Sequence, residues 1–201
     1  MLAHKNVVVL VSGGGTNLQA LIDAQNRGEI LPGKISCVIS SNPQAYALTR
    51  AKNAGISTLA VPRKEYGSRE QYDEAILAVL EKQQADLIVL AGFMYVLGEK
   101  VIRRYERRII NVHPALIPSF CGDGFYGLHV HEAALNYGVK VTGATVHFVN
   151  EVTDGGQIIL QKAVEVEEGD TPQTLQKRVM EQAEWELLPK AVSLFCQGKI
   201  K

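Results

Sequence analysis

Hydrophobic residues alternate along the first half of the chain between short continuous runs and stretches with helical spacing. Val, Ile and Leu fill the short runs, a pattern typical of strands buried on both faces of a sheet. These runs predict strands at residues 7–11, 34–40, 58–61, 86–91 and 108–112. The stretches between them predict helices at residues 17–24, 45–54, 68–83 and 101–105. The alternation favours an α/β fold: an open, mostly parallel, twisted sheet of Rossmann-like form with helices on both faces.

The second half of the chain follows a different pattern. Residues 129–137 have helical spacing, and two longer apolar runs at 141–149 and 158–164 flank the tight sequence Asp154-Gly155-Gly156. We expect these two runs to form a hairpin-like pair of strands that extends the sheet.

The C-terminal residues 171–196 predict one long helix. Pro189 should kink or split this helix, because proline has no N–H to donate and its ring clashes with the preceding turn. No repeat or linker interrupts the sequence, and 201 residues suit a single domain.

Charge and cysteine content narrow the class of protein. The chain has 21 basic and 21 acidic residues, so no broad basic field is expected for nucleic acid or an anionic membrane. Cys37, Cys121 and Cys196 lie far apart without a Cys-x-x-Cys pair, which favours a reducing, cytoplasmic location. The apolar run at 7–11 is shorter than a signal segment, which needs about 7–15 residues, or a transmembrane helix, which needs about 20.

A glycine-rich loop, Ser12-Gly-Gly-Gly-Thr-Asn17, follows the first predicted strand. The next helix would present free N–H groups and the positive end of its dipole there, which favours an anion such as phosphate. No Gly-Lys-Ser/Thr follows, so this is not a Walker loop, and Leu18 stands where a dinucleotide loop has its third glycine. A small phosphorylated substrate is therefore favoured over a dinucleotide; the alternative is a tight turn that binds no ligand.

A second group of polar residues follows the fifth predicted strand. Asn111 and His113 lie on the same side of that strand because side chains alternate, and Asp154 comes from the later glycine turn. An amide and a protonated imidazole can stabilise an oxyanion, and a carboxylate can accept a proton and favour the imidazolium. This set suits acyl transfer to an amine. The alternative is a structural histidine and an ordinary turn.

The remaining histidines and Cys121 suggest other chemistry only weakly. His129 and His131 are two residues apart on a predicted helix, so their side chains do not face each other, and we expect no bound metal. His147 lies in a predicted strand, where we expect it to support the site. No base accompanies Cys121, so we do not expect a nucleophilic thiol.

Several motifs resemble those of the folate-dependent formyltransferases; they are segments 7–20, 90–94, 110–118 and 143–149, with Asp154-Gly-Gly156. The string Asn-x-His-Pro-x-Leu-x-Pro, which begins at Asn111, is specific to that family. The loop that begins at Ser12 is similar to the corresponding loop in the branch of the family that acts on glycinamide ribonucleotide. The resemblance implies transfer of a formyl group from the co-substrate 10-formyltetrahydrofolate to the amine of glycinamide ribonucleotide, a step of purine synthesis.

The resemblance also implies roles for individual residues. Asn111 and His113 would stabilise the formyl oxyanion, and Asp154 would pair with His113 and manage the proton. Thr145, like His147, would lie behind the site. The residues implied in binding glycinamide ribonucleotide are Gly14, Gly15, Thr16 and Asn17 for the phosphate and Glu184 for the ribose hydroxyls. The residues implied in binding folate are Arg69, Leu90, Met94, Tyr95, Val96, Leu97, Asn111, Val149, Asn150, Glu151 and Asp154.

The chain departs from the family pattern at two places. Tyr95 stands where family members often have an arginine, and residues 119–128 look longer than in many members. We expect this segment to act as a lid near the substrates. Within the single domain 1–201, residues up to about 110 would form the phosphoribosyl half, and residues from about 111 the catalytic and folate half.

Two enzyme relatives and one non-catalytic protein are the alternatives. A formyltetrahydrofolate hydrolase carries an extra N-terminal domain, and a tRNA-directed formyltransferase carries a C-terminal barrel and basic surface. Because the first strand begins near residue 6 and the chain ends after its long helix, we expect the transferase domain alone. A catalytically idle phosphoribosyl- or folate-binding module is the third alternative. We expect only small-molecule partners, and a monomer or homodimer.

Overall fold

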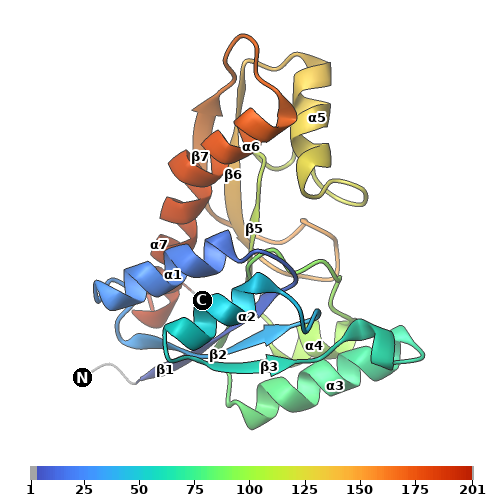
Figure 1. Ribbon diagram of the computed structural model, residues 1–201, viewed down its shortest axis with the longest axis vertical. Coiled ribbons are helices and arrows are strands. Elements are labelled where there is room, and N and C mark those ends of the chain that lie inside the picture. Colours follow the sequence, from blue (N-terminus) through green and yellow to red (C-terminus); the bar gives the residue numbers. More distant parts are fainter. Residues whose placement is uncertain (1–3, 201) are drawn as a thin grey trace.

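A computed structural model describes residues 4–200, which form a seven-stranded sheet in the order β3-β2-β1-β4-β5-β6-β7 (Figure 1). Neighbours among the first five strands are parallel, whereas β6 and β7 join the sheet antiparallel. The predicted mostly parallel sheet and the predicted hairpin-like pair are therefore confirmed. The strands are β1 (Lys5–Val11), β2 (Gly33–Ser40), β3 (Ser57–Ala60), β4 (Leu87–Leu90), β5 (Ile109–His113), β6 (Val141–Phe148) and β7 (Ile158–Glu165).

Helices cover both faces of the sheet, as the sequence predicts. One buried cluster joins the sheet to α1, α2, α6 and α7, and a second cluster joins the opposite face to α3 and α4. The helices are α1 (Thr16–Asn26), α2 (Tyr46–Asn53), α3 (Arg69–Lys82), α4 (Glu99–Arg104), α5 (Leu128–Tyr137), α6 (Pro172–Val179) and α7 (Trp185–Cys196), with a 3₁₀ turn at Arg63–Glu65 that the sequence did not predict.

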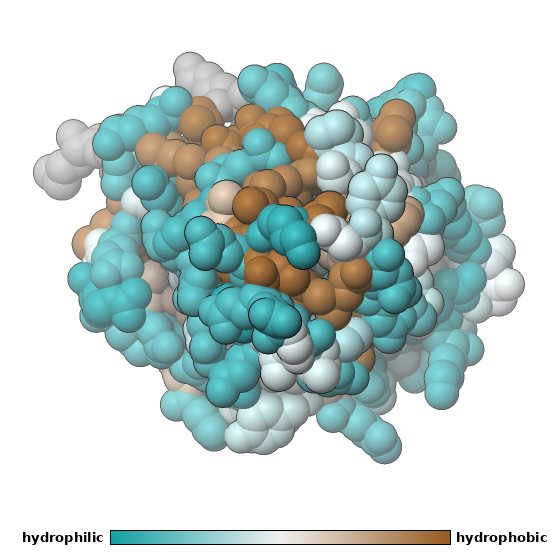
Figure 2. All heavy atoms as spheres, turned by 90° about the horizontal axis from the view of Figure 1, so that it is seen from above, coloured by the Kyte–Doolittle hydropathy of each residue, from teal (hydrophilic) through white to brown (hydrophobic). Residues whose placement is uncertain are grey.

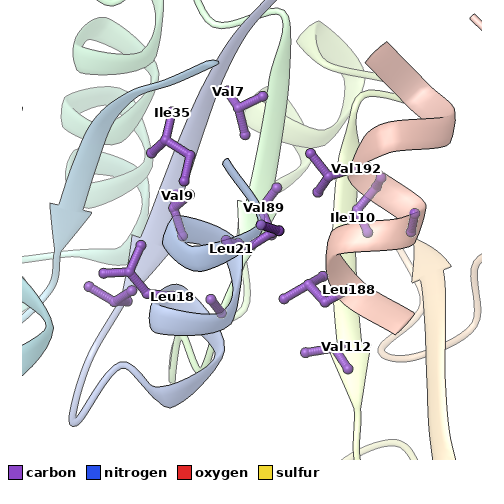
Figure 3. Close-up of a cluster of buried hydrophobic side chains, with 14 of the residues drawn as sticks. Val7, Val9, Leu18, Leu21, Ile35, Val89, Ile110, Val112, Leu188 and Val192 are labelled. Atoms are coloured by element: carbon purple, nitrogen blue, oxygen red, sulfur yellow. The ribbon is translucent and has the colours of Figure 1, made fainter. Parts of the chain in front are cut away.

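The strand side chains divide between the two clusters by simple alternation. Val7, Val9 and Val11 face α1 and α7, whereas Val8 and Leu10 face α3 and α4. Each such side chain stabilises the fold by about 1.5–3 kcal/mol when it is fully buried. Figure 3 shows the first cluster, in which the labelled side chains from the sheet and helices are Val7, Val9, Ile35, Val89, Ile110, Val112, Leu18, Leu21, Leu188 and Val192.

The C-terminal helix is interrupted, but not where the sequence predicts. The α-helical pattern changes to a π-helix at Met180–Glu184, and α7 then continues through Pro189. The expected split is therefore present, but it lies before Pro189 rather than at the proline itself. The proline ring crowds the carbonyl four residues before it, that of Trp185, and the wider π turn ends just before this position. The irregular turn ends on Glu184, whose buried side chain faces α1.

Figure 2 shows one face of the molecule, on which hydrophilic side chains are widespread. Seen from above, on the end where α5 lies, it has an apolar area framed by hydrophilic side chains (Figure 2). Within residues 4–200, no helix has the length and apolar character that a membrane span requires.

The turn between β1 and α1 packs closely against α2. Gly15 caps α1 with a φ of 74°, and a Cβ built on it would lie 2.6 Å from the Cβ and 2.9 Å from the Cα of Ala47. Both the left-handed backbone and the close approach of α2 therefore require glycine at this position.

We predict that Gly15→Ala lowers the free energy of unfolding by about 2 kcal/mol or more, because it adds left-handed strain to a clash with the backbone of α2. Urea unfolding measures the change. Gly14→Ala is the matched control, since no atom lies within 4 Å of a Cβ at Gly14. Equal stability of the two variants would contradict the close packing of this turn.

Candidate active site

The loops that follow β1 and β4 meet at the carboxyl edge of the parallel strands. The Ser12 N–H donates to the Gly92 carbonyl at 3.1 Å, and the Met94 N–H donates to the Ser12 hydroxyl at 2.9 Å. Ser12 and Ser41 also share a hydrogen bond of 2.7 Å between their hydroxyls. This edge is where open α/β sheets bind ligands. The glycine loop and residues 92–97 therefore border one region.

The antiparallel pairing of β5 with β6 brings four polar side chains to one face. Asn111 lies opposite His147, and His113 lies opposite Thr145. The alternating residues Ile110 and Val112 point into the core on the other face. The predicted placement of Asn111 and His113 on the same side of the strand is confirmed.

His147 links Asn111 with Asp154. The Asn111 amide lies 3.2 Å from His147 Nε2, and His147 Nδ1 donates to the Phe148 carbonyl at 2.8 Å. Nε2 thus lies between the Asn111 amide and Asp154 Oδ1, which is 3.5 Å away. The register of β6 against β7 shifts between Val146 and His147, because β7 has one extra residue, Ile159, between the partners of these two. Bulges of this kind are over-represented next to active sites.

His113 lies between a backbone carbonyl and a carboxylate. Its Nε2 donates to the Phe120 carbonyl at 2.7 Å, and its Nδ1 lies 3.5 Å from Asp154 Oδ2. Burial lowers the pKa of His113, and the Asp154 charge and the Phe120 carbonyl oppose burial without overcoming it. We expected Asp154 to favour the imidazolium, and it does so, but burial has the larger effect.

Asp154 is held in a tight turn. Its φ is 55°, and its Oδ2 accepts from the Gly122 N–H at 2.9 Å. Burial raises the pKa of the Asp154 carboxyl, but its interactions with His147, the Gly122 N–H and His113 outweigh burial and hold the pKa below 3.8. The carboxylate is therefore ionised at neutral pH, where it faces both histidines.

Thr145 and Gln161 hold the segment that follows β5. The Thr145 hydroxyl donates to the Ala115 carbonyl at 2.7 Å and accepts from the Ile117 N–H at 3.1 Å. The Gln161 amide donates to this hydroxyl and to the Ile117 carbonyl, both at 3.0 Å. Thr145 thus lies behind the site, as we expected, and anchors the backbone from which residues 119–128 begin.

A buried contact joins the glycine loop to the π turn. The Asn17 amide donates to Glu184 Oε2 at 2.6 Å, although the two residues are far apart in the sequence. Burial raises the pKa of Glu184 to about 7, and the Asn17 amide only partly offsets this effect. Asn17 Oδ1 is buried without a partner among the described residues. Buried polar atoms are rarely left without a partner, so a hydrogen-bond donor, either a ligand hydroxyl or a water molecule, would fit next to Asn17 Oδ1.

The expected folate residues include a hydrophobic group and a group of polar residues with contacts of their own. Leu90, Leu97 and Val149 pack in one hydrophobic cluster, whereas Met94 and Val96 lie beside it and are each 55% exposed. The Asn150 side chain instead accepts from the Val152 N–H at 3.0 Å and orders the following turn. Glu151 is exposed and pairs with Arg103 of α4 at 3.3 Å.

Arg69 and Tyr95 lie at the border of this cluster. Ser68 caps α3 by accepting from the Gln71 N–H, which places Arg69 at the first helical position. Arg69 then donates to the Val96 and Leu97 carbonyls at 3.2 and 3.3 Å. The Tyr95 ring packs against Phe93 and Tyr72, with ring centroids 5.9 and 5.6 Å away. At this position the Tyr95 ring contributes aromatic packing, whereas an arginine would contribute a positive charge.

A family comparison agrees with this geometry. A model of the formyl transferase family matches residues 5–192. The chain belongs to the formyl transferase family. Phosphoribosylglycinamide formyltransferase of Haemophilus influenzae is 41% identical over 197 residues, which is 98% of this chain and 90% of that relative.

The chain is also similar to solved structures and to longer proteins. The crystal structure of glycinamide ribonucleotide transformylase 1 from Symbiobacterium toebii has a TM-score of 0.91 and 41% identity, and the match covers 97% of this chain and 89% of that one. The trifunctional purine biosynthetic protein adenosine-3 of Gallus gallus is 43% identical over 97% of this chain. The chain spans only 19% of the length of that trifunctional relative.

Some contacts of this formyl transferase have no clear signal in the sequence. The Phe120 carbonyl and the Gly122 N–H touch His113 and Asp154 through backbone atoms, which no side-chain pattern reveals. Gln161 lies in β7 as one polar residue among others. Arg50 of α2 donates to the Gly14 carbonyl at 2.9 Å, although its sequence neighbours suggest an ordinary surface helix.

The other histidines and Cys121 lie outside this network of contacts. His129 is exposed and lies 3.1 Å from Glu132. His131 is buried, and burial together with the His113 charge lowers its pKa to about 4. Burial raises the pKa of the Cys121 thiol, and its Sγ donates to the Pro118 carbonyl. Across residues 4–200, no group of three or more His, Cys, Asp or Glu side chains is arranged to hold a metal.

We predict that Glu184 makes stability fall as pH rises. Its pKa is about 7 in the folded chain and about 4.5 when unfolded, so the folded state binds the extra proton between these values. The contribution of Glu184 to the free energy of unfolding is complete below pH 4.5. It is lost as pH rises through 7, and the total loss is about 3 kcal/mol. Glu184→Gln should remove this loss and gain stability at pH 8 relative to the wild type.

Urea unfolding at pH 5 and pH 8 measures this effect. Glu181→Gln is the matched control, because Glu181 lies in the same turn but is exposed. An identical pH dependence in wild type and Glu184→Gln would show that Glu184 is ionised at little cost in the folded chain.

Proposed function

We propose that the chain transfers the formyl group of 10-formyltetrahydrofolate to the amine of glycinamide ribonucleotide, giving formylglycinamide ribonucleotide and tetrahydrofolate in purine synthesis. The observation that carries this proposal is the meeting of Asn111, His113 and Asp154 at the end of β5, with 3.5 Å between His113 and Asp154. Relatives of about the same length, named phosphoribosylglycinamide formyltransferase, support the choice of acceptor.

The reaction needs an oxyanion to be stabilised. Attack of the amine on the formyl carbon forms a tetrahedral intermediate whose oxygen carries the charge. The Asn111 amide and the His113 imidazole lie on the same face of β5, where both can donate to that oxygen. His113 Nε2 is bound to the Phe120 carbonyl in this structure, so segment 119–128 must release this bond for Nε2 to reach the intermediate. That requirement supports a lid role for the segment.

Asp154 has two functions in this proposal. Its carboxylate raises the pKa of His113 against the effect of burial, which increases the fraction of imidazolium that can serve the oxyanion. It also has the low pKa of a base that stays ionised, so it can accept the amine proton directly or through an ordered water. The substrate supplies its own nucleophile, and no serine or cysteine has to be activated.

The acceptor would lie between the glycine loop and the π turn. The first turn of α1 has N–H groups that precede its first internal hydrogen bond, from the Gln19 N–H to the Gly15 carbonyl. The N–H groups of Thr16 and Asn17 in this turn, together with those of Gly14 and Gly15 in the loop, would bind the phosphate. Glu184 and the unpartnered Asn17 Oδ1 would bind the ribose hydroxyls, since a buried carboxyl and an amide oxygen are both good acceptors.

The folate would lie against the hydrophobic cluster at the end of β4. Leu90, Leu97 and Val149 form its apolar base, and the exposed Met94 and Val96 would cover one side of the pterin. The segments around this cluster contribute Tyr95, Arg69, Asn150 and Glu151. Asn111 and Asp154 would face the end of the folate that carries the formyl group. In this arrangement the glycine loop, before residue 110, holds the phosphate, Glu184 reaches the ribose from the C-terminal half, and the catalytic groups come from residues after about 110.

The setting of the reaction follows from its chemistry. Both substrates are small molecules, and the donor is a co-substrate rather than a resident cofactor. We place the enzyme in the cytoplasm as a monomer or homodimer.

An absorbance assay of 10-formyltetrahydrofolate consumption tests the proposed function. We expect consumption that depends on glycinamide ribonucleotide and yields one tetrahydrofolate per formylated product. Equal consumption without the amine would identify a hydrolase instead. Binding of both compounds with no consumption would identify a non-catalytic module.

We predict that Asp154→Asn lowers kcat by about a hundredfold or more, because it removes the base and lowers the pKa of His113 further. The pH profile of kcat/KM reports the second effect: its His113 limb should move to lower pH. Glu132→Gln on α5 is the control, because it removes one exposed carboxylate from outside the network. A variant with unchanged kcat and an unchanged pH profile would exclude Asp154 from the mechanism.

A further inference from the structure

Two successive carbonyls of the glycine loop point toward α2. The Gly13 carbonyl accepts from the Ala47 N–H at 3.1 Å, and the Gly14 carbonyl accepts from Arg50 Nε at 2.9 Å. In a trans peptide the C=O and the following N–H point in opposite directions. The N–H groups of Gly14 and Gly15 are therefore turned away from α2. Successive N–H groups on one side of a loop form a concave site for an anion.

The Arg50 guanidinium is held on three sides. Besides Gly14, it donates through Nη1 to Gln19 Oε1 at 3.1 Å, and it lies over the Tyr46 ring with 5.0 Å to the centroid. No carboxylate within residues 4–200 forms an ion pair with it. Its positive charge therefore lies directly behind the loop without a direct ion pair, and the Gln19 side chain that accepts from it donates in turn to Asp23 at 2.9 Å.

Two further observations point to a ligand at this place. Asn17 Oδ1, in the first turn of α1, is buried without a partner, and Asn17 is only 8% exposed. A hollow of about 270 Å³ opens beside the loop and is lined by Thr16, Gln19, Ala20, Asp23, Arg27, Arg50 and Trp185. The loop thus has an oriented set of donors, a buried free acceptor and space next to them.

We propose that Arg50 is a positioning residue for the phosphate of the substrate. It acts through the Gly14 peptide: its Nε holds the carbonyl toward α2, and this fixes the Gly15 N–H in the direction of the phosphate. Its charge adds to the field of the α1 dipole at the same point. The proposal rests on the proposed function and assigns a residue of α2 to that site.

Arginine suits this position better than lysine. A planar guanidinium donates to the Gly14 carbonyl and the Gln19 amide at once in a fixed geometry, and it stacks on an aromatic ring. A lysine ammonium supplies the same charge as a flexible point but cannot hold both acceptors and the ring contact together. Charge and orientation can therefore be separated by substitution.

The test compares wild type, Arg50→Ala and Arg50→Lys, with Lys52→Ala as the control. Lys52 is an exposed basic residue of the same helix, so it matches the loss of charge. Calorimetry measures the Kd of glycinamide ribonucleotide without folate, and steady-state assays measure kcat and KM. Each measurement is repeated with glycinamide riboside, which lacks the phosphate, and thermal unfolding checks that each variant is folded.

We expect Arg50→Ala to raise the Kd and KM of glycinamide ribonucleotide about tenfold to a hundredfold, the range for loss of a hydrogen bond that involves a charged group. Its kcat and its use of the riboside should stay close to those of the wild type. Arg50→Lys should recover only part of the affinity, and Lys52→Ala should resemble the wild type. This pattern supports a role directed at the phosphate.

Three results would overturn the proposal. One is an equal loss for the ribonucleotide and the riboside, which indicates general damage to the site. Another is an equal loss in Lys52→Ala, which indicates a diffuse charge effect. The third is full recovery of affinity in Arg50→Lys, which would show that a positive charge is sufficient and that the planar guanidinium is not required. If the wild type binds the ribonucleotide through Arg50 but transfers no formyl group, the proposed function fails and the role of Arg50 stands.

Discussion

The antiparallel pairing of β5 with β6 is the constraint on which the candidate site depends. It places Asn111 opposite His147 and His113 opposite Thr145, so four polar side chains share one face of two neighbouring strands. The other face of the same strands packs in the core through Ile110 and Val146. Side chains alternate with a period of two, so a shift of one residue would turn the polar set into the hydrophobic core and the apolar side chains toward the site. The core therefore specifies the register that assembles the site.

Burial and charge act against each other within that site. His113 and Asp154 lie close enough to stabilise each other's charged forms, yet burial lowers the pKa of His113 and favours its neutral form. Asp154 stays ionised because backbone and side-chain contacts outweigh its own burial. Segment 119–128 takes part in this balance, since the Phe120 carbonyl and the Gly122 N–H contact the two side chains. Movement of this segment would thus change both the geometry and the protonation of the site.

Recognition of the phosphate in our proposal is local. The formal net charge is zero, so the protein has no excess positive charge to draw an anion from a distance. The glycine loop offers oriented N–H groups, with Arg50 on the side of α2 and the buried pair of Asn17 and Glu184 on the side of α7. The π turn at Met180–Glu184 supplies Glu184 from a segment that is remote in sequence. Irregular turns of this kind occur frequently at functional sites.

The sequence by itself determined the fold class and the position of most strands and helices, because hydrophobic period and glycine turns are local signals. It also indicated the glycine loop and the pairing of Asn111 with His113 on one side of a strand, which follow from spacing alone. Residues 69, 90 and 94–97 were predicted from family motifs, and their contacts with folate stay a prediction. Only the tertiary structure decided the break in the C-terminal helix, the burial that lowers the pKa of His113 and the contacts of Arg50, Gln161 and the Phe120 carbonyl. These depend on which segments pack together and on how deeply a charge is buried, and neither property is encoded in the spacing of residues along one strand or helix.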